Sequence, residues 1–389
     1  MNCNVCGTTF GSSLYQSGSN VSLTTMNALI EGETKIFFCD HCGHTQTNEL
    51  DDLERYYAEE YEINIDSVND DQLYAVVDGA EVYRSEHQAN VLMQKIDLSR
   101  FSNVLDYGCA KAATLRAVRS KMPELQPYFF DVTDKYVPFW KEFENPKSYA
   151  SFQPNPDWFG KIEVLLSFYA LEHIPDLNKI LKDVKQLLCE GGYFYFLVPN
   201  LYQNAADFIV ADHVNHFSRS SLKYMMEHNG FYDVEIDENA HFAAFVVSGR
   251  LGSANNEVPP SLSAHEIIET KDKAKSVAEL WNNAKDHIRA FEENSETDAN
   301  VAIYGAGIYG NFIFSCLKNP NAVQNFIDRN KFLIGRKTHG KVVISPDDPI
   351  AENSVVYVGL NPKSARQIIG SLTNFQNKSL SFFFLDDQL

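Results

Sequence analysis

Apolar and amphipathic segments alternate along the middle of this chain. Apolar stretches of strand length begin at four points: Val104, Pro127, Ile162 and Gly192. Residues 177–188, between the last two stretches, show the apolar spacing of a helix. The alternation resumes at Val301, after a polar helical segment over residues 264–293. Strands that alternate with helices predict mostly parallel, doubly wound sheets.

Less regular segments connect these units. Residues 50–65 are acidic and rich in Tyr, and residues 83–95 have helical character, so both are expected to link the N-terminal part to the central sheet. The pair Gly191-Gly192 is expected to end the preceding helix. Residues 240–247 read as a further strand, and the Ser-, Asn- and Pro-containing residues 251–264 mark a connection.

The segment from Val104 to Leu115 is the most informative of the strand–turn–helix units. Gly108 permits the backbone to come close to a ligand at the N-terminus of the next helix. Ala110 and Ala112 stand where a phosphate-binding turn would carry further glycine. By itself the segment therefore fits either a ligand-binding turn or an ordinary structural one.

Charge and composition narrow the classes of partner. The chain has 389 residues and a formal charge of −19, so it lacks the general basic footprint of proteins that bind nucleic acid or anionic membranes. Its N-terminus has no signal-peptide pattern, and no apolar run reaches the roughly 18 residues of a membrane span. We expect a cytoplasmic protein, in which the seven cysteines are thiols or metal ligands.

Two C-x-x-C pairs predict a metal site near the N-terminus: Cys3, Cys6, Cys39 and Cys42. Four thiolates on two turns are the ligands that tetrahedral zinc prefers, and a closed four-sulfur site is structural. The strand-like residues 35–38 agree with a small zinc ribbon. His41 and His44 are competing ligands by type, but we expect them to be loop histidines.

The central segment resembles the class I S-adenosylmethionine-dependent methyltransferases. The resemblance rests on four elements in the family's order: Val104–Cys109, Asp131, Leu171–Ile174 and Cys189–Gly192. It implies a Rossmann-like domain in which the first turn lies against the methionine half of the cofactor. The implied cofactor-binding residues are Asp106, Gly108, Cys109, Asp131, Ser167 and Phe168.

Two of these implied roles have structural alternatives. The resemblance implies that Asp131 binds the ribose hydroxyls of the cofactor, since a carboxylate can accept both hydrogen bonds. An Asp at the end of a strand can also serve as a helix cap. Glu172 and His173 fit either packing or hydrogen-bonding roles beside the cofactor.

The wider arrangement resembles the sugar C-methyltransferases that modify nucleotide-linked deoxysugars. It implies a zinc module and linker over 1–60, a methyltransferase domain over 61–250, and a linker helix with a Rossmann-like substrate domain over 251–389. The family's Glu-His pair corresponds to Asp212 and His213, with Asp in place of Glu. Val210 stands where the family commonly has Tyr.

Carbon methylation beside a ketone requires a base for the α-proton and a group that stabilises the enolate. We expect His213 to be the base and Asp212 or a neighbouring group to orient it. His213 and His216 also fit phosphate binding or a closed loop. Their spacing provides no obvious third or fourth ligand for a metal. Tyr74 is a candidate substrate-binding aromatic, and a packed surface Tyr is the alternative.

The C-terminal turn is a complete G-x-G-x-x-G after an apolar strand: Gly305, Gly307 and Gly310. Taken alone it suggests NAD, with Asp328 near the ribose position. The resemblance implies instead that this domain helps to form a nucleotide-sugar site, and a purely structural turn also fits.

The leading hypothesis is therefore methylation of a nucleotide-linked ketosugar by a zinc-containing enzyme. The alternatives are O-methylation of a sugar or glycan, an NAD-dependent oxidoreductase, and a cofactor-binding protein without turnover. The last is suggested by Ala110, Ala112 and Val210. The expected partner is a small molecule and not nucleic acid or membrane.

Overall fold

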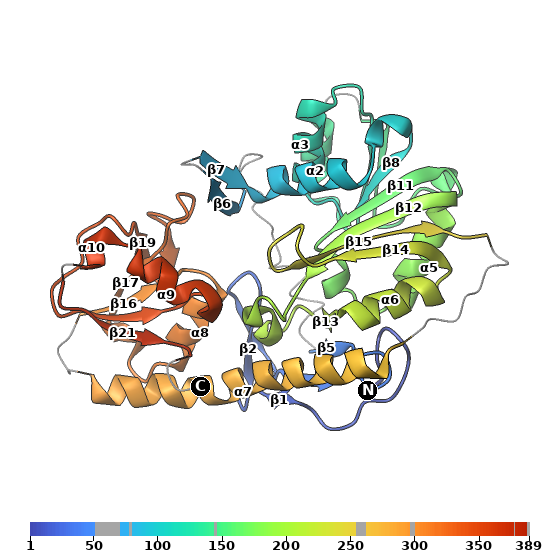
Figure 1. The fold of residues 1–389 in the computed structure, drawn as a ribbon. Coiled ribbons are helices and arrows are strands. Elements are labelled where there is room, and N and C mark those ends of the chain that lie inside the picture. The colour runs from blue at the N-terminus through green and yellow to red at the C-terminus, as the bar shows by residue number, and fades with distance from the viewer. Residues whose placement is uncertain are drawn as a thin grey trace.

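The computed structural model describes residues 1–50, 71–77, 80–143, 146–253, 262–295, 300–376 and 378–386. Two α/β units lie next to each other, and helix α7 (Ala264–Asn294) runs along one side of both (Figure 1). The acidic, Tyr-rich linker expected over residues 50–65, apart from Leu50, and most of the connection expected over 251–264 lie outside the described residues. None of the described helices is long and apolar enough to cross a membrane.

The N-terminal part forms two small sheets. One is a hairpin of β2 (Val21–Leu23) and β3 (Leu29–Glu31). The other has the order β1-β4-β5-β13; its strands are β1 (Tyr15–Gln16), β4 (Lys35–Phe38), β5 (Thr45–Thr47) and β13 (Asn215–His216). Because β13 comes from far along the chain, the central part of the protein completes this N-terminal sheet.

The central sheet has seven strands in the order β10-β9-β8-β11-β12-β15-β14. These are β8 (Val104–Tyr107), β9 (Tyr128–Asp131), β10 (Ser148–Ser151), β11 (Ile162–Phe168), β12 (Leu188–Pro199), β14 (Phe231–Asp237) and β15 (Ala244–Leu251). All pairs are parallel except the two made by β15. Strands β8 and β11 are mostly buried because helices cover both faces of the sheet.

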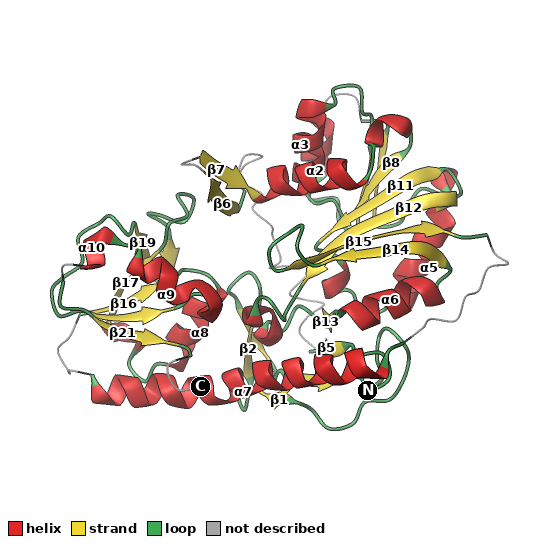
Figure 2. Cartoon of the chain, in the orientation of Figure 1, coloured by secondary structure: helices red, strands yellow, loops and turns green. Residues whose placement is uncertain are grey.

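Helices α2 and α3 pack on one face of this sheet and α5 and α6 on the other (Figure 2). The helices of this unit are α2 (Arg84–Lys95), α3 (Ala113–Lys121), α4 (Val137–Lys141), α5 (Leu177–Leu187) and α6 (Arg219–His228). Short 3-10 turns are η2 (Leu98–Arg100), η3 (Pro156–Trp158), η4 (Leu171–His173) and η5 (Ala205–Ile209). Strands β6 (Leu73–Val77) and β7 (Ala80–Tyr83) form a hairpin before α2.

The end of α5 differs from the sequence expectation. Asp176 caps its N-terminus by accepting the Lys179 N–H at 3.0 Å, but the helix stops at Leu187, before the two glycines that were expected to end it. Strand β12 begins at once and runs through both of them. Gly191 has a φ of 75°, so it serves a bend within the strand.

The C-terminal sheet has the order β18-β19-β17-β16-β20-β21 and is parallel except for β18. Its strands are β16 (Val301–Tyr304), β17 (Val323–Ile327), β18 (Lys337–Thr338), β19 (Lys341–Ile344), β20 (Val355–Val358) and β21 (Ser381–Phe384). Its other elements are α8 (Ile308–Cys316), α9 (Pro362–Gly370), α10 (Thr373–Gln376) and η6 (Pro320–Ala322). The predicted second doubly wound unit is therefore present.

One of the hydrophobic clusters among the described residues joins separate parts of the chain. It contains residues of the N-terminal sheet, η5, α7 and the C-terminal unit, among them Ile36, Phe208, Trp281 and Tyr309. The indole N–H of Trp281 also donates to the carbonyl of Ala205 at 2.8 Å. Helix α7 thus fixes η5 between the two α/β units.

Candidate active site and metal centre

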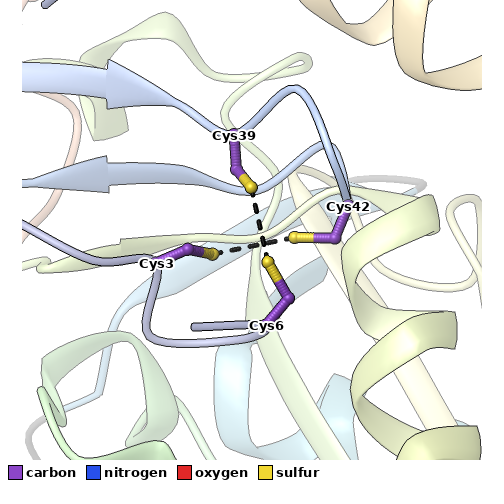
Figure 3. Close-up of side chains that lie close together, drawn as sticks. All are labelled: Cys3, Cys6, Cys39 and Cys42. Carbon is purple, nitrogen blue, oxygen red and sulfur yellow. Dashed lines mark hydrogen bonds between the residues drawn. The ribbon is translucent and has the colours of Figure 1, made fainter. Parts of the chain in front are cut away.

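Four thiols converge near the N-terminus (Figure 3): Cys3, Cys6, Cys39 and Cys42. The Sγ atoms of Cys3 and Cys42 are 3.7 Å apart, and those of Cys6 and Cys39 are 3.4 Å apart. A tetrahedral zinc ion with bonds of about 2.3 Å would hold sulfur atoms about 3.8 Å apart. The four cysteines therefore fit the zinc ion that their spacing predicts.

The two cysteine turns share one backbone form. Gly7 and Gly43 each follow the second cysteine of a pair, and both have a φ of 75°. Each donates its N–H to the carbonyl of the first cysteine in its turn, at 2.8 and 2.9 Å. His44 lies outside the thiol cluster, because its Nε2 faces the Asn215 Oδ1 at 3.3 Å and burial lowers its pKa to about 3.

The turn after β8 has a strained backbone. Gly108, Ala110 and Ala112 have φ values of 72°, 43° and 56°. The two alanines thus take the left-handed conformation that favours glycine, at a cost of roughly 1–2 kcal/mol each. A Cβ on Gly108 would lie 3.0 Å from the Ala170 Cβ. Strain of this kind is concentrated where a backbone is shaped for a ligand.

Two carboxyl groups lie beneath this turn. Asp131 Oδ2 accepts the Ala110 N–H at 2.9 Å, and Asp131 Oδ1 accepts the Thr133 N–H at 3.3 Å. Burial raises the pKa of Asp131 to about 6. Burial, with the charge of Asp131, raises the pKa of Asp106 to about 8. The two groups therefore form a buried acidic pair at the carboxyl ends of neighbouring strands.

Unpartnered polar atoms mark the same edge of the sheet. Asp106 Oδ1 and Ser167 Oγ are buried, and neither has a hydrogen-bond partner among the residues that the structure describes. Their strands, β8 and β11, are paired at the point where the strand order reverses, which is where doubly wound sheets bind ligands. Phe168 is half-buried beside them, and the Cys109 thiol is buried in the turn. A polar ligand would satisfy these atoms.

A second cluster lies beyond the carboxyl ends of β11 and β12. The carboxylate of Asp207, in η5, bridges two imidazoles: Oδ1 is 2.5 Å from His213 Nδ1, and Oδ2 is 2.9 Å from His216 Nδ1. Burial alone would lower the pKa of His213, but the charge of Asp207 and its hydrogen bond outweigh burial and raise the pKa to about 9. His213 is thus a stronger base than a free imidazole.

The acidic partner of His213 is a different residue from the one expected. Asp212 points its carboxylate at Thr25, accepting the backbone N–H at 2.8 Å and a short hydrogen bond from the hydroxyl. The backbone carbonyl of Asp212 lies 2.9 Å from His173 Nδ1. Asp207 therefore occupies the orienting position for which Asp212 was expected.

Two predicted substrate-binding side chains, His216 and Tyr74, have partners within the protein. His216 is buried, and both ring nitrogens have partners, since Nε2 is 2.8 Å from the Thr47 hydroxyl. It is therefore poorly placed to bind substrate. Tyr74 stacks on His87 with ring centroids 3.9 Å apart, and its hydroxyl accepts the Phe242 N–H at 2.8 Å. Tyr74 therefore belongs to an aromatic group with His87 and His241.

The C-terminal glycine turn is close-packed. A Cβ on Gly305 would lie 2.2 Å from the Gly359 carbonyl oxygen, and one on Gly310 would lie 1.9 Å from that of Gly305. Gly307 has no heavy atom within 4 Å of its Cβ position. Asp328 Oδ2 accepts the Ala306 N–H at 2.9 Å, as Asp131 does in the central unit. Packing thus explains the first and third glycines and leaves the second open to a ligand.

Comparison with protein families identifies the central unit. Residues 83–236 match a family described as a methyltransferase domain. The chain contains a methyltransferase domain. A curated relative, the C-methyltransferase NovU of Streptomyces niveus, is 30% identical over 156 residues. That alignment covers 37% of this chain and 37% of NovU, so the similarity spans little more than a third of either protein.

Solved structures of low sequence identity also resemble part of this chain. Human N-acetylserotonin methyltransferase, in complex with SAM, gives a TM-score of 0.37 at 14% identity, covering 43% of this chain and 52% of that one. The CurJ carbon methyltransferase gives a TM-score of 0.35 at 15% identity, covering 41% and 51%.

Two important residues around the methyltransferase domain escaped prediction. Asp207 lies in a stretch without a recognisable motif, and only the fold brings it to His213. Asn215 donates its side-chain N–H groups to the carbonyls of Leu171 and Ile174, at 2.9 and 2.7 Å. Asn215 therefore fixes η4 against the segment that carries His213. An Asn between two histidines was the available signal, but its partners are distant in the sequence.

Proposed function

We propose that this protein transfers a methyl group from S-adenosylmethionine. When bound, the cofactor supplies an electrophilic methyl on sulfur. The match of residues 83–236 to a methyltransferase domain carries the proposal. The unpartnered Asp106 Oδ1 and Ser167 Oγ fit a polar cofactor, and the carboxylate of Asp131 is suited to the ribose hydroxyls. Gly108 and Cys109 would border the methionine half, with Phe168 beside the cofactor.

We further propose that the acceptor is a carbon next to the ketone of a nucleotide-linked sugar. The similarity to a C-methyltransferase supports carbon as the acceptor atom. The ketone makes the neighbouring C–H bond acidic enough for a protein base, and His213 provides one. The sugar and nucleotide are inferred from the three-part arrangement of the chain.

The geometry of His213 defines the base step. In the neutral form of His213, the Nδ1–H donates to Asp207 and Nε2 carries the lone pair. Nε2 takes the α-proton, and the electron pair of the broken C–H bond is delocalised into the enolate. The enolate carbon would then bond to the methyl group as the sulfur–methyl bond breaks, and the electron pair of that bond would stay on sulfur as S-adenosylhomocysteine leaves. Asp207 stabilises the imidazolium that results.

The C-terminal unit is proposed to hold the nucleotide end of the acceptor. The carboxyl ends of β16 and β20 face the loop before η5: Asn361 donates to the Gln203 carbonyl at 2.9 Å, and Lys363 Nζ donates to the Tyr202 carbonyl at 2.7 Å. Tyr309 donates its hydroxyl to Asn204 at 2.9 Å. A ligand bound at Gly307 would therefore lie beside the loop before η5, and this loop leads to Asp207.

We propose a structural role for zinc at the four cysteines. The zinc module, the methyltransferase domain and the substrate unit would occupy residues 1–60, 61–250 and 251–389. The thiols must be reduced to bind the ion, which favours the cytoplasm. Zinc would stabilise the strands that pair with the segment carrying His213.

Product analysis tests this function. The protein is incubated with S-adenosylmethionine labelled with ¹³C at the methyl group and a panel of nucleoside-diphosphate ketosugars. We expect NMR to show a labelled methyl bonded to the carbon beside the carbonyl. A methyl on oxygen would establish O-methylation instead. Reduction of the ketone with NADH would support an oxidoreductase, and cofactor binding without turnover across the panel would contradict the proposed reaction.

A further inference from the structure

Glu172 is a buried acid without a hydrogen-bond partner. It lies in η4, is fully buried, and neither carboxylate oxygen has a partner among the described side chains and backbone. Leaving a buried polar group unpaired costs roughly 1–3 kcal/mol, and more for a charged one. Such an atom calls for a ligand that the protein itself does not provide.

Two imidazoles surround this carboxyl group. Glu172, His173 and His213 each offer one ligand atom, and these atoms lie within 4.8 Å of one another. The rings of His173 and His213 meet edge to face, with centroids 4.6 Å apart. The three side chains come from two segments, η4 and the loop before β13, which the amide of Asn215 ties together.

Both histidines are held as metal-binding histidines usually are. His213 Nδ1 is bonded to the carboxylate of Asp207, and His173 Nδ1 faces the backbone carbonyl of Asp212. A carboxylate or carbonyl on one ring nitrogen fixes the tautomer and directs the other nitrogen at the metal. The supporting groups expected around a metal site are therefore present.

We propose that Glu172, His173 and His213 bind a divalent transition-metal ion of the zinc class. Two imidazoles and a carboxylate are a common ligand set for such ions. Bonds of about 2.0–2.2 Å to one ion separate its ligand atoms by roughly 3.4 Å, so the side chains need to close by no more than about 1.4 Å. The unpartnered carboxyl of Glu172 is able to rotate toward the ion.

The catalytic consequence of this site rests on the proposed function. The Nε2 lone pair of His213 accepts either the substrate proton or the metal ion. An occupied site therefore has no base, and the ion is an inhibitor that competes with proton abstraction. The site differs from the four-thiol centre in its nitrogen and oxygen ligands, which select harder ions than thiolates do.

Cobalt binding tests the site without any substrate. Full-length protein loaded with one equivalent of Zn²⁺ is titrated with Co²⁺, then desalted and analysed for both metals. We expect one further equivalent of Co²⁺, with visible absorption bands but without the near-ultraviolet charge transfer of cobalt thiolates. Glu172→Gln and His173→Gln should each weaken binding by about 10-fold or more. His241→Gln is the matched control, since His241 is also buried with an unpartnered Nε2 among the described residues.

The outcomes separate this site from the proposed reaction. The proposal is overturned if the wild type binds no second equivalent, or if both trio variants bind Co²⁺ as tightly as the control. Retention of the first zinc and an unchanged circular dichroism spectrum identify folded variants, and His173→Gln provides the test if Glu172→Gln does not fold. Bound Co²⁺ should abolish methyl transfer by the wild type. Turnover without a cobalt site leaves the proposed function intact, and a cobalt site without turnover leaves the metal proposal intact.

Discussion

The side-chain N–H of Asn4 donates a hydrogen bond to the Asn215 Oδ1 at 2.9 Å. Asn4 lies between the first two cysteines, and Asn215 lies two residues after His213. The next strand extends the link, since Gln46 pairs with Asn215 and Thr45 with His216. The metal-binding turns are thus in direct contact with the proposed catalytic segment.

Loss of zinc should therefore destabilise the protein and its active site together. Cys39→Ser with Cys42→Ser should reduce zinc from one equivalent to none and lower the thermal midpoint, because metal binding contributes directly to folding. Metal analysis and calorimetry measure the two effects. Cys189→Ser, at a half-buried cysteine outside the cluster, is the control and should keep one zinc. A double variant of normal stability would contradict a structural zinc site.

Replacing Asp207 should impair catalysis more than cofactor binding. In Asp207→Asn, the amide no longer stabilises the imidazolium of His213, and the favoured tautomer is lost. We expect kcat to fall about 10²- to 10⁴-fold with little change in the Kd for S-adenosylmethionine. Steady-state kinetics and calorimetry measure both quantities. If Asp212→Asn caused the larger loss of kcat, the assignment of Asp207 as the orienting group would be wrong.

Cofactor affinity should depend on the ionisation of Asp131. Burial raises the pKa of this group to about 6 in the free protein, so the carboxylate is lost as the pH falls through about 6. A protonated group accepts hydrogen bonds from the ribose less well, and affinity should therefore decrease below that pH. Titration calorimetry from about pH 5 to about pH 8 measures this change in cofactor affinity.

The same experiment has a matched pair of variants. Asp131→Asn should weaken S-adenosylmethionine binding about 10- to 100-fold and flatten its pH dependence. Asp328→Asn changes the equivalent position of the C-terminal turn and should leave the affinity as it is. Equal losses of S-adenosylmethionine affinity in both variants would contradict the assignment of the cofactor to the central sheet.

Alanine variants of the glycines in the C-terminal turn should distinguish a packing role from a role in binding the nucleotide sugar. Gly305→Ala meets a carbonyl oxygen at 2.2 Å and a φ of 99°, so it should cost at least about 1–3 kcal/mol and lower the thermal midpoint by several degrees. Gly307→Ala has open space and should cost about 1 kcal/mol or less. Its effect should appear instead as weaker binding of the nucleotide sugar. Unchanged binding by Gly307→Ala would make the turn purely structural.

The sequence was sufficient for features that depend on local pattern. Buried parallel strands have continuous apolar runs, so β8, β9, β11 and β16 could be located from the pattern of apolar residues along the sequence. The two C-x-x-C pairs indicated a metal cluster because their spacing fits one turn each. The two alanines after Gly108 take a left-handed backbone that sequence preference alone argues against.

Features that depend on distant partners could not be obtained in this way. Strand β13 has only two residues and pairs with β5, about 170 positions earlier in the sequence, so it leaves no hydrophobic period. The shared carboxylate of Asp207 lies in a short irregular turn. A metal role for His213 and His216 was not expected, because their spacing offers no obvious third or fourth ligand, whereas folding brings Glu172 and His173 to His213.

Hydrogen exchange at the substrate carbon reports directly whether His213 generates an enolate. The protein is incubated in D₂O with a nucleoside-diphosphate ketosugar and S-adenosylhomocysteine, and NMR follows the proton on the carbon beside the ketone. We expect the wild type to replace this proton with deuterium, whereas His213→Gln, folded and still able to bind the cofactor, should not. Exchange at the wild-type rate in His213→Gln, or none in a wild type that methylates the same sugar, would contradict this role of His213.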